Sequence, residues 1–313
     1  MNFLITGGTG FIGSALANYL VEQGHHVRAL DDLSAGGEPQ VLDARVHFTR
    51  GDVRDIPKLW TLLNSVDCVF HLAARVSVPE SVLYPVEYND VNVGGTVSLM
   101  AAVRDAGVKR VVLASSGAIY GEQMQQPVSE QMAVNPQTPY AVSKLAAEQY
   151  VLAIGALWKI ETVILRVFNA YGPGQPLPPA HAPVIPLYLK QVLGGGSLIV
   201  HGGGVQTRDF VYIDDVVRAM ALAAQTPGLN RTMLNVGSGQ ETSINQLVNV
   251  IESVTGYEAH RIDRAMESGG VSRLVANISR AKEVLGFAPQ VELREGLHQM
   301  TIKDTRFSRK EPA

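Results

Sequence analysis

The sequence contains a single cysteine, Cys68, among its 313 residues. One cysteine cannot form an internal disulfide, and the largely apolar run 66–70 around it predicts an inert, buried thiol. We also find no signal-peptide pattern and no apolar stretch of about 20 residues that would span a bilayer. These absences lead us to expect a soluble, cytoplasmic protein.

Blocks of lysine and arginine are missing as well, and the formal net charge is -3. The chain therefore lacks the positive surface with which proteins bind nucleic-acid backbones or anionic membranes. We expect neither of these partners, and we expect no bound metal. With 46% hydrophobic and 18% charged residues, the chain can bury a substantial core.

Short β-branched runs alternate with longer helix-like stretches along the first half of the chain. The runs cover residues 3–6, 26–30, 46–49, 68–72, 110–114 and 162–166. Strands alternating with helices predict an α/β fold with a doubly wound parallel sheet of the Rossmann type.

The composition changes after Gly172, where six prolines occur between Pro173 and Pro186. Such a run predicts a loop, and we place a domain boundary there. Residues 1–172 are expected to form the Rossmann domain. Residues 173–313 are expected to form a smaller C-terminal α/β domain, with helices at 213–224 and 244–254 and some segments returning to the Rossmann sheet.

A glycine motif joins the first strand to an amphipathic helix at 14–23, and it reads Gly7-Gly8-Thr9-Gly10-Phe11-Ile12-Gly13. Glycines at this place permit a tight turn, and the helix N-terminus offers free N–H groups to a pyrophosphate. Asp31 ends the next strand, where a carboxylate accepts from ribose hydroxyls and repels a 2′-phosphate. The motif therefore predicts NAD rather than NADP, the alternative being that Asp31 and Asp32 only cap a turn.

Tyr140 and Lys144 lie four residues apart in a helical pattern, so both side chains share one helix face. A nearby ammonium is expected to lower the tyrosine pKa and make Tyr140 a general base. Ser116 follows the strand at 110–114, at the edge where parallel sheets bind ligands. A hydroxyl there can bond both the phenol and a substrate oxygen, whereas the alternative is an exposed Tyr–Lys pair without function.

These motifs, together with Leu72-Ala73-Ala74, Leu165-Arg166-Val167-Phe168-Asn169 and Thr207-Arg208-Asp209-Phe210-Val211, resemble the extended short-chain dehydrogenases. The resemblance is strongest to the UDP-glucose 4-epimerase group and runs from residue 1 to about Pro289. It implies that residues 1–172 form the NAD-binding domain and that residues 173–313 mainly bind the substrate. The implied cofactor contacts are Gly7, Gly10, Phe11, Ile12, Gly13, Asp31, Asp32, Leu33, Ser34, Gly36, Asp52, Val53, Leu72, Ala73, Ala74, Tyr140, Lys144 and Phe168.

The resemblance also implies a substrate site for a nucleotide-diphosphate sugar, with UDP as the expected nucleotide. Its implied contacts are Ser77, Ser116, Tyr140, Asn169, Val184, Arg208 and Arg273. For two of them a structural role stays open: Asn169 in a turn, and Arg208 in an ion pair with Asp209. A homodimer through the helices at 86–106 and 140–157 is implied as well.

The residues after Ser116 separate the chemistries within this family. Related dehydratases carry an Asp-Glu pair there and related decarboxylases a Glu, whereas this chain has Gly117-Ala118. The resemblance therefore implies C4 epimerisation: Tyr140 takes the C4 hydroxyl proton, Ser116 and Lys144 assist, and a transient 4-keto sugar is reduced on its other face. The alternatives are a reductase or uronate epimerase and, from another class, a non-catalytic dinucleotide-binding protein.

The chain departs from the family at 267–271, where the usual Arg-Pro-Gly-Asp-Val is replaced by Glu-Ser-Gly-Gly-Val. Arg273 is a candidate replacement for the missing phosphate contact, with a plain surface arginine as the alternative. Leu274 falls where residue size is thought to limit the sugar's C2 substituent. Its intermediate size, together with the stretch 77–81, leaves plain hexoses, N-acetylhexosamines and uronic acids open.

Overall fold

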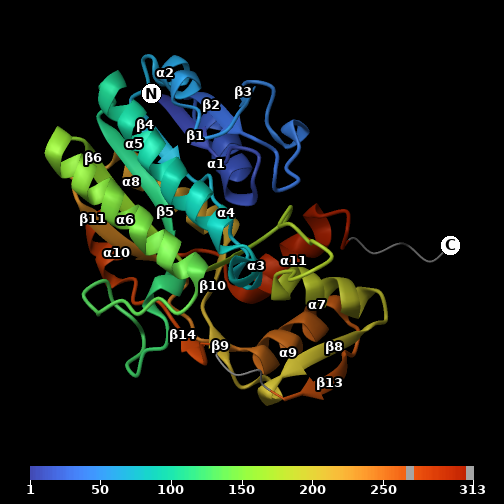
Figure 1. Ribbon diagram of the computed structural model, residues 1–313. Helices are drawn as coiled ribbons and strands as arrows, with labels where there is room; N and C mark the ends of the chain where they lie inside the picture. Colours follow the sequence, from blue (N-terminus) through green and yellow to red (C-terminus); the bar gives the residue numbers. More distant parts are fainter. Residues whose placement is uncertain (266–270, 308–313) are drawn as a thin grey trace.

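Seven parallel strands form one sheet in the order β11-β6-β5-β4-β1-β2-β3 (Figure 1). The computed structural model describes residues 1–265 and 271–307. The strands of the sheet are β1 (Asn2–Thr6), β2 (His26–Asp31), β3 (His47–Arg50), β4 (Cys68–His71), β5 (Arg110–Ser116), β6 (Glu161–Val167) and β11 (Thr232–Val236). Six of them coincide with the predicted runs to within one or two residues, which confirms the doubly wound Rossmann-type fold. The seventh, β11, was not predicted as a strand.

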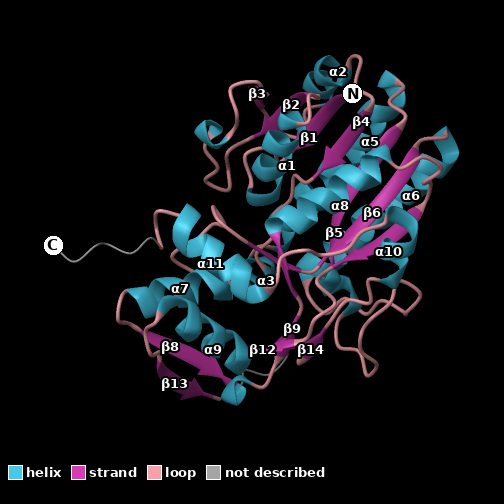
Figure 2. Ribbon diagram, turned by 180° about the vertical axis from the view of Figure 1, so that it is seen from behind, coloured by secondary structure: helices cyan, strands magenta, loops and turns pink. Residues whose placement is uncertain are grey.

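Helices cover both faces of the sheet, because successive residues of each buried strand point to opposite sides. On one face α1 (Phe11–Glu22) and α8 (Ile213–Gln225) pack on residues such as Phe3, Ile5 and Leu165. On the other face α2 (Ile56–Leu63), α5 (Gly95–Ala106) and α6 (Pro139–Trp158) pack on residues such as Leu4 and Ile164. Figure 2 shows the helices against the strands from behind.

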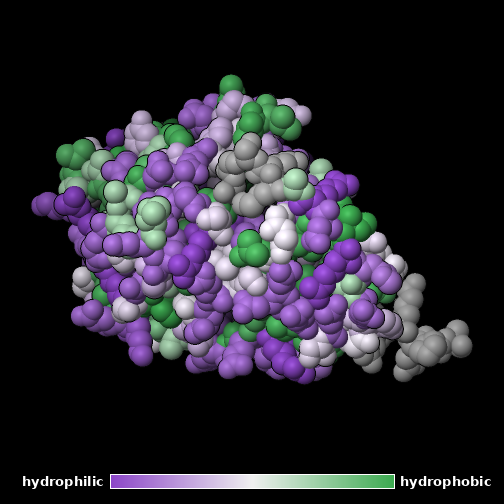
Figure 3. Space-filling view, turned by 90° about the horizontal axis from the view of Figure 1, so that it is seen from below, coloured by the Kyte–Doolittle hydropathy of each residue, from purple (hydrophilic) through white to green (hydrophobic). Residues whose placement is uncertain are grey.

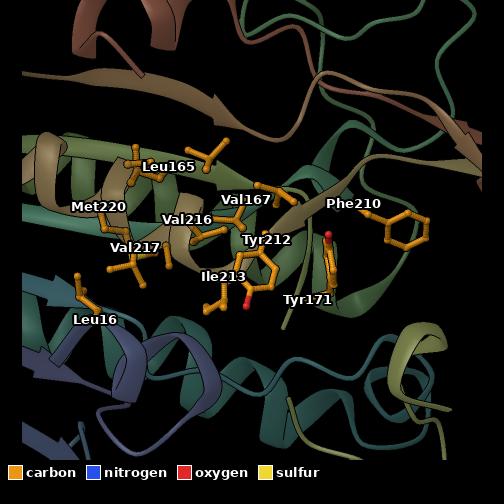
Figure 4. Close-up of a cluster of buried hydrophobic side chains, with 14 of the residues drawn as sticks. Leu16, Leu165, Val167, Tyr171, Phe210, Tyr212, Ile213, Val216, Val217 and Met220 are labelled. Atoms are coloured by element: carbon orange, nitrogen blue, oxygen red, sulfur yellow. The ribbon is translucent and has the colours of Figure 1, made fainter. Parts of the chain in front are cut away.

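The core continues beyond the end of the sheet. Two short parallel strands, β7 (Asn169–Tyr171) and β10 (Phe210–Tyr212), pair just after β6 and just before α8. Their aromatic side chains Tyr171, Phe210 and Tyr212 pack on one another, and Figure 4 shows them beside the α8 residues that face β6. This aromatic cluster joins the Rossmann sheet to the C-terminal elements.

The C-terminal elements form a second group, lowest in Figure 1. They are α7 (Val184–Leu193), β8 (Ser197–His201), η4 (Gly202–Gly204), β9 (Thr207–Arg208), β12 (Thr242–Ser243), α9 (Ile244–Thr255), β13 (His260–Arg264), β14 (Arg273–Leu274) and α11 (Leu293–Lys303). β8 pairs with β13, and β9 lies between β12 and β14. α10 (Ser279–Leu285) instead packs beside β11 and α8.

Two local predictions need correction. The proline-rich loop ends earlier than expected, because α7 begins at Val184 and accepts Pro186 in its first turn, where a missing N–H costs no intrahelical bond. The helix expected at 86–106 is interrupted: α4 (Pro85–Asn89) passes through a π-helical turn, η2 (Asp90–Gly94), into α5. Within the described residues, no helix is long and apolar enough to cross a lipid bilayer.

Candidate active site

The predicted cofactor residues follow the carboxyl ends of neighbouring strands. The glycine motif follows β1, Asp31 to Gly36 end or follow β2, and Asp52 and Val53 follow β3. Leu72 to Ala74 follow β4, Ser116 ends β5, and Phe168 follows β6. All these strands are parallel, so the structure brings the residues to one edge of the sheet, where such folds bind ligands.

The glycine motif forms a tight turn against the β4 loop. Gly7 has φ of 73°, and a Cβ on it would lie 2.7 Å from the Ala73 nitrogen, so no other residue fits there. A Cβ on Gly13 would collide with the Gly7 carbonyl oxygen. The helix α1 begins at Phe11 without a side-chain cap or an acidic residue in its first turn. Its first N–H groups are therefore open to an anion such as a pyrophosphate.

Asp31 and Thr9 connect the turn to β2. The Asp31 carboxylate accepts hydrogen bonds from the backbone nitrogens of Thr9 (3.0 Å) and Leu33 (2.9 Å). Each oxygen takes one donor, which leaves acceptor positions for ribose hydroxyls. The Thr9 hydroxyl is buried and has no partner within the described residues. The turn thus both anchors Asp31 and leaves polar capacity unused, which fits a bound dinucleotide.

The other predicted cofactor residues are positioned by local contacts. Asp32 accepts from the Ser34 nitrogen and hydroxyl. Leu33 and Gly36, in the same loop after β2, have positive φ. The Asp52 carboxylate is bound by the Arg54 guanidinium, which lowers the pKa of Asp52.

Two further cofactor predictions rest on apolar contacts. Val53 is buried, and a Cβ on Gly95 of α5 would lie 2.5 Å from its side chain. Phe168 is buried with its ring against Gly117, where an added Cβ would lie 3.3 Å from ring atoms. These two side chains therefore shape the edge of the sheet on either side of the Ser116 loop.

The predicted catalytic residues Ser116, Tyr140 and Lys144 come together. Tyr140 and Lys144 lie one turn apart at the start of α6, and both are buried. The Ser116 hydroxyl lies near enough to the Tyr140 hydroxyl to lower the pKa of Tyr140, and its Oγ accepts from the Ala118 nitrogen at 3.1 Å. Tyr88 of α4 packs edge-on against the Tyr140 ring, with centroids 6.5 Å apart.

The predicted lowering of the Tyr140 pKa is wrong for the protein alone. Burial raises the pKa of Tyr140, and the hydrogen bond with Ser116 opposes this only in part. Burial also lowers the pKa of Lys144 to about 8, against the attraction of Glu148. The spacing of the two residues indicated their proximity, but it could not indicate the desolvation that acts on both groups.

A buried polar network behind Lys144 was missed by the sequence analysis. His71, at the end of β4, bonds Thr6 through Nδ1 (2.8 Å) and Thr96 through Nε2 (2.9 Å). The Thr96 hydroxyl donates to the Asn92 carbonyl at 2.6 Å, so it accepts from His71, which assigns the Nε2–H tautomer. Burial and the charge of Lys144 lower the pKa of His71 to about 3, so its ring stays neutral.

Asn92 continues this network from the π-helical turn η2. Its side chain accepts from the Arg75 nitrogen (2.8 Å) and donates to the Arg75 carbonyl (3.0 Å) and to the Ser143 hydroxyl (2.9 Å). The loop after β4 is therefore tied to the helix that carries Tyr140 and Lys144. The sequence around residue 92 contains no signal for this role, because the side-chain partners of Asn92 come from two distant segments.

Two of the predicted substrate contacts lie on short strands: Arg208 on β9, and Asn169 on β7, which pairs with β10. Asp209 is fully buried and accepts from Ser238, Gly239 and Ala276, so it does not form the ion pair considered for Arg208. Arg208 donates to its own neighbour, the Thr207 carbonyl, at 2.7 Å. Asn169 is exposed, and only its backbone bonds Asp209.

The other residues predicted to contact the substrate lie on separate elements. Arg273 forms a bidentate ion pair with Glu241 (2.5 and 2.6 Å) and pairs with Thr207 in the strand register, while Leu274 pairs with Arg208. Leu274 is therefore the residue that shares a face with Arg208.

Two further predicted contacts lie at the starts of helices. Ser77 caps the short helix α3 (Val78–Leu83), and its carbonyl accepts from the Tyr88 hydroxyl. Val184 begins α7. Residues 267–270 lie outside the described residues.

Residues 3–237 match the NAD dependent epimerase/dehydratase family. The chain belongs to this family. A UDP-glucose 4-epimerase from Mycolicibacterium smegmatis is 38% identical over 303 residues, which cover 95% of this chain and 96% of that protein.

Solved structures give the same result. The UDP-glucose 4-epimerase of Thermotoga maritima with UDP-glucose has a TM-score of 0.92 at 34% identity, covering 96% of this chain and 98% of that one. A UDP-glucuronic acid 4-epimerase from Bacillus cereus, in complex with UDP-glucuronic acid and NAD, has a TM-score of 0.88 at 31% identity, covering 96% and 98%. These comparisons confirm the predicted family, the NAD dependence and the class of activity.

Proposed function

We propose that this protein is an NAD-dependent 4-epimerase of UDP-linked sugars. One observation carries the proposal: Ser116 ends β5 at the same sheet edge as the glycine turn, and the buried Tyr140 and Lys144 lie one turn apart at the start of α6. This arrangement provides a single proton-transfer group beside a dinucleotide site, which is sufficient for oxidising and re-reducing one carbinol carbon. No second acid follows Ser116, because Gly117 and Ala118 occupy those positions.

The proposed catalytic roles follow from the contacts of each side chain. The Tyr140 oxygen takes the proton of the sugar's C4 hydroxyl. It returns the proton when the 4-keto intermediate is reduced on its other face. The Ser116 hydroxyl orients that oxygen and contacts the substrate oxygen. The Lys144 ammonium stabilises the phenolate form of Tyr140 and contacts the cofactor ribose. When bound, NAD supplies reversible oxidation at C4 and a positive ring charge that favours the phenolate.

The residues of the sheet edge fit this cofactor. The turn from Gly7 to Gly13 and the first N–H groups of α1 would hold the pyrophosphate. Asp31 would accept from the adenosine ribose, with Asp32 to Gly36 closing the turn over it. Asp52 and Val53 would flank the adenine, and Leu72 to Ala74 and Phe168 would line the dinucleotide. Each assignment is supported by the position of these residues at the carboxyl ends of adjacent strands.

Arg208 is the proposed contact for the sugar nucleotide's diphosphate. Burial lowers the pKa of its guanidinium. One of its N–H groups donates to the Thr207 carbonyl, which leaves other N–H groups available for a phosphate. Asn169 and Val184 are proposed to lie along the nucleotide, and Ser77 near the sugar. Arg273 is a second candidate for the diphosphate, although it would first have to leave Glu241.

We further propose that two copies associate through α5 and α6, which pack side by side in Figure 1. Val142 and Leu157 of α6 are 52% and 78% exposed, and they share one helix face with Ala146 and Ala153. A second copy of this stripe would bury it. Light scattering should report a dimer that dissociates in Leu157→Asp, whereas Ile302→Asp, at an exposed position of α11, should leave it intact.

The activity is tested with purified protein and separate samples of UDP-glucose, UDP-N-acetylglucosamine and UDP-glucuronic acid, each with and without added NAD. Proton NMR follows the sugar while absorbance follows NADH. Interconversion at C4 without net NADH supports the proposal and identifies the sugar. Net NADH formation or consumption would instead assign a dehydrogenase or reductase, and no conversion of any sugar by cofactor-loaded protein would overturn the proposal.

A further inference from the structure

Glu148 is a buried carboxylate on the same helix as the two catalytic residues. It lies one turn after Lys144 and two turns after Tyr140, and it is fully buried. Its Oε1 accepts from the Ser115 hydroxyl at 2.5 Å, and its two oxygens accept from Arg166 at 3.1 and 2.8 Å. A buried carboxylate is costly unless it is paired in this way, so its position is fixed by β5 and β6 together.

The contacts of Glu148 reach the segment that follows Ser116. Arg166 also donates to the Tyr120 hydroxyl at 2.9 Å, and its guanidinium lies 5.1 Å from the centre of the Tyr120 ring. Tyr120 belongs to η3 (Gly117–Tyr120), which begins directly after Ser116. The network therefore connects both chain neighbours of Ser116, Ser115 on one side and η3 on the other, to the helix of Tyr140 and Lys144.

We propose that Glu148 is a positioning residue of the active site: its carboxylate, bonded to Ser115 of β5 and Arg166 of β6, locks β5 to α6 and fixes Ser116 against Tyr140, and it places a negative charge one helical turn from Lys144. Glu148 contacts neither the reacting atoms nor the cofactor edge, so it acts through Ser115 and Lys144. The effect of Glu148 on the charge of Lys144 does not depend on which sugar is the substrate. The effect of Glu148 on turnover rests on the proposed function.

The groups facing Lys144 come from two elements. On α6 these are Tyr140 and Glu148, and from β4 His71 approaches, with its ring neutral. Arg166 lies on the other side of Glu148 and balances its charge. Within the described residues, Glu148 is the anion whose attraction raises the pKa of Lys144 against burial. Removing this charge leaves burial unopposed, so the ammonium form should be lost at lower pH.

The test measures the Lys144 titration directly by NMR of protein labelled with ¹³C- and ¹⁵N-lysine. The Lys144 signal is assigned by its loss in Lys144→Met. Glu148→Gln keeps an acceptor for Ser115 and removes the charge. Glu130→Gln is the matched control, because Glu130 is another buried carboxylate, at the far end of the network, where it accepts from the Asn235 nitrogen at 2.8 Å.

We expect the Lys144 pKa to fall by about one unit or more in Glu148→Gln, which is a tenfold change in the ammonium-to-amine ratio. In Glu130→Gln it should not change. The alkaline limb of the kcat profile should move to lower pH by the same amount as the Lys144 titration. An unchanged Lys144 titration in Glu148→Gln would overturn the proposal. A shifted titration in a protein that epimerises no sugar would refute only the proposed function.

Removal of one partner of a buried ion pair can prevent folding, so a second variant tests the positional role. Ser115→Ala removes the bond between β5 and Glu148 and leaves the charge in place. It should lower kcat about tenfold or more with the Lys144 titration unchanged, because Ser116 then loses its fixed position. Wild-type kcat in a folded Ser115→Ala protein would overturn the positional part of the proposal.

Discussion

The polar side chains around Tyr140 and those around Arg208 are held in different ways. Behind Tyr140, His71, Asn92 and Glu148 are each at most 2% exposed, and each is bonded at both ends. Around Arg208 the ion pairs are open to solvent: Arg273 and Glu241 are 50% and 32% exposed. Hydrophilic residues also predominate on the face of the molecule shown in Figure 3.

This difference in burial distinguishes the side chains that carry out the reaction from those that recognise the substrate. Buried, fully bonded networks fix geometry, whereas exposed pairs contribute little energy and rearrange readily. We infer that the proton-transfer site is set by the fold itself, and that the region of β9, β12 and β14 adapts to the nucleotide and sugar. Substitutions in the first region should therefore change kcat, and in the second region loss of the Arg208 guanidinium should change KM.

The largest effect is expected for Tyr140→Phe. The variant removes one hydroxyl and keeps the ring that packs against Tyr88, so folding and NAD binding should be retained. Because proton transfer by a positioned group contributes about 100-fold to 10,000-fold, kcat should fall by that factor. The rate of C4 interconversion by NMR, with bound NAD measured separately, checks this. Activity within tenfold of wild type would show that another group is the base.

A smaller effect of a different kind is expected for Arg208→Met. This change keeps much of the side-chain length and removes the guanidinium, so KM for the sugar nucleotide should rise about tenfold or more with kcat little changed. Arg261→Met, on the exposed strand β13, is the control and should leave KM unaltered. A fall in kcat alone for Arg208→Met would place Arg208 with the chemistry and remove the contrast between the two regions.

The neutral state of His71 makes a prediction about stability. Its pKa is about 3 in the folded protein and 6.5 when unperturbed, so between these values the unfolded chain binds more protons. The free energy of unfolding should therefore fall as pH decreases from about 6.5 towards 3, by up to about 1.4 kcal/mol per pH unit from this group. Denaturant unfolding of wild type and His71→Gln should show a shallower pH slope in the variant. Parallel slopes would mean that His71 is charged when folded.

Much of the fold could be predicted because its signals are local. Six strands of the sheet are short β-branched runs, and the glycine turn stands directly between a strand and a helix. β11 was missed because its place depends on pairing with β6, about 70 residues earlier in the chain. The break at η2 was missed because the contacts of this turn come from distant segments: Asn92 bonds Arg75 and Ser143.

The candidate site shows the same division. Ser116, Tyr140 and Lys144 were predicted from motif spacing, and the structure brings them together. His71 and Glu148 were not predicted, because their partners lie on other strands and helices. The direction of the Tyr140 pKa was wrong for a related reason: burial depends on the whole fold, and no spacing of two residues along a helix reveals it.

The smallest effect is expected for Arg273→Ala, and this prediction sharpens the comparison most. Glu241 binds one edge of the Arg273 guanidinium, through Nε and Nη2, and Arg273 lies on the opposite strand face from Arg208. Exposed pairs of this kind contribute little, so KM should change by less than about threefold. If the Arg273–Glu241 pair is only structural, Glu241→Gln should also change KM by less than about threefold. If Arg273→Ala instead raises KM as much as Arg208→Met does, and Glu241→Gln lowers it, then Glu241 and the diphosphate compete for Arg273. The exposed pair would then be part of nucleotide recognition, and its contribution to KM would not be small.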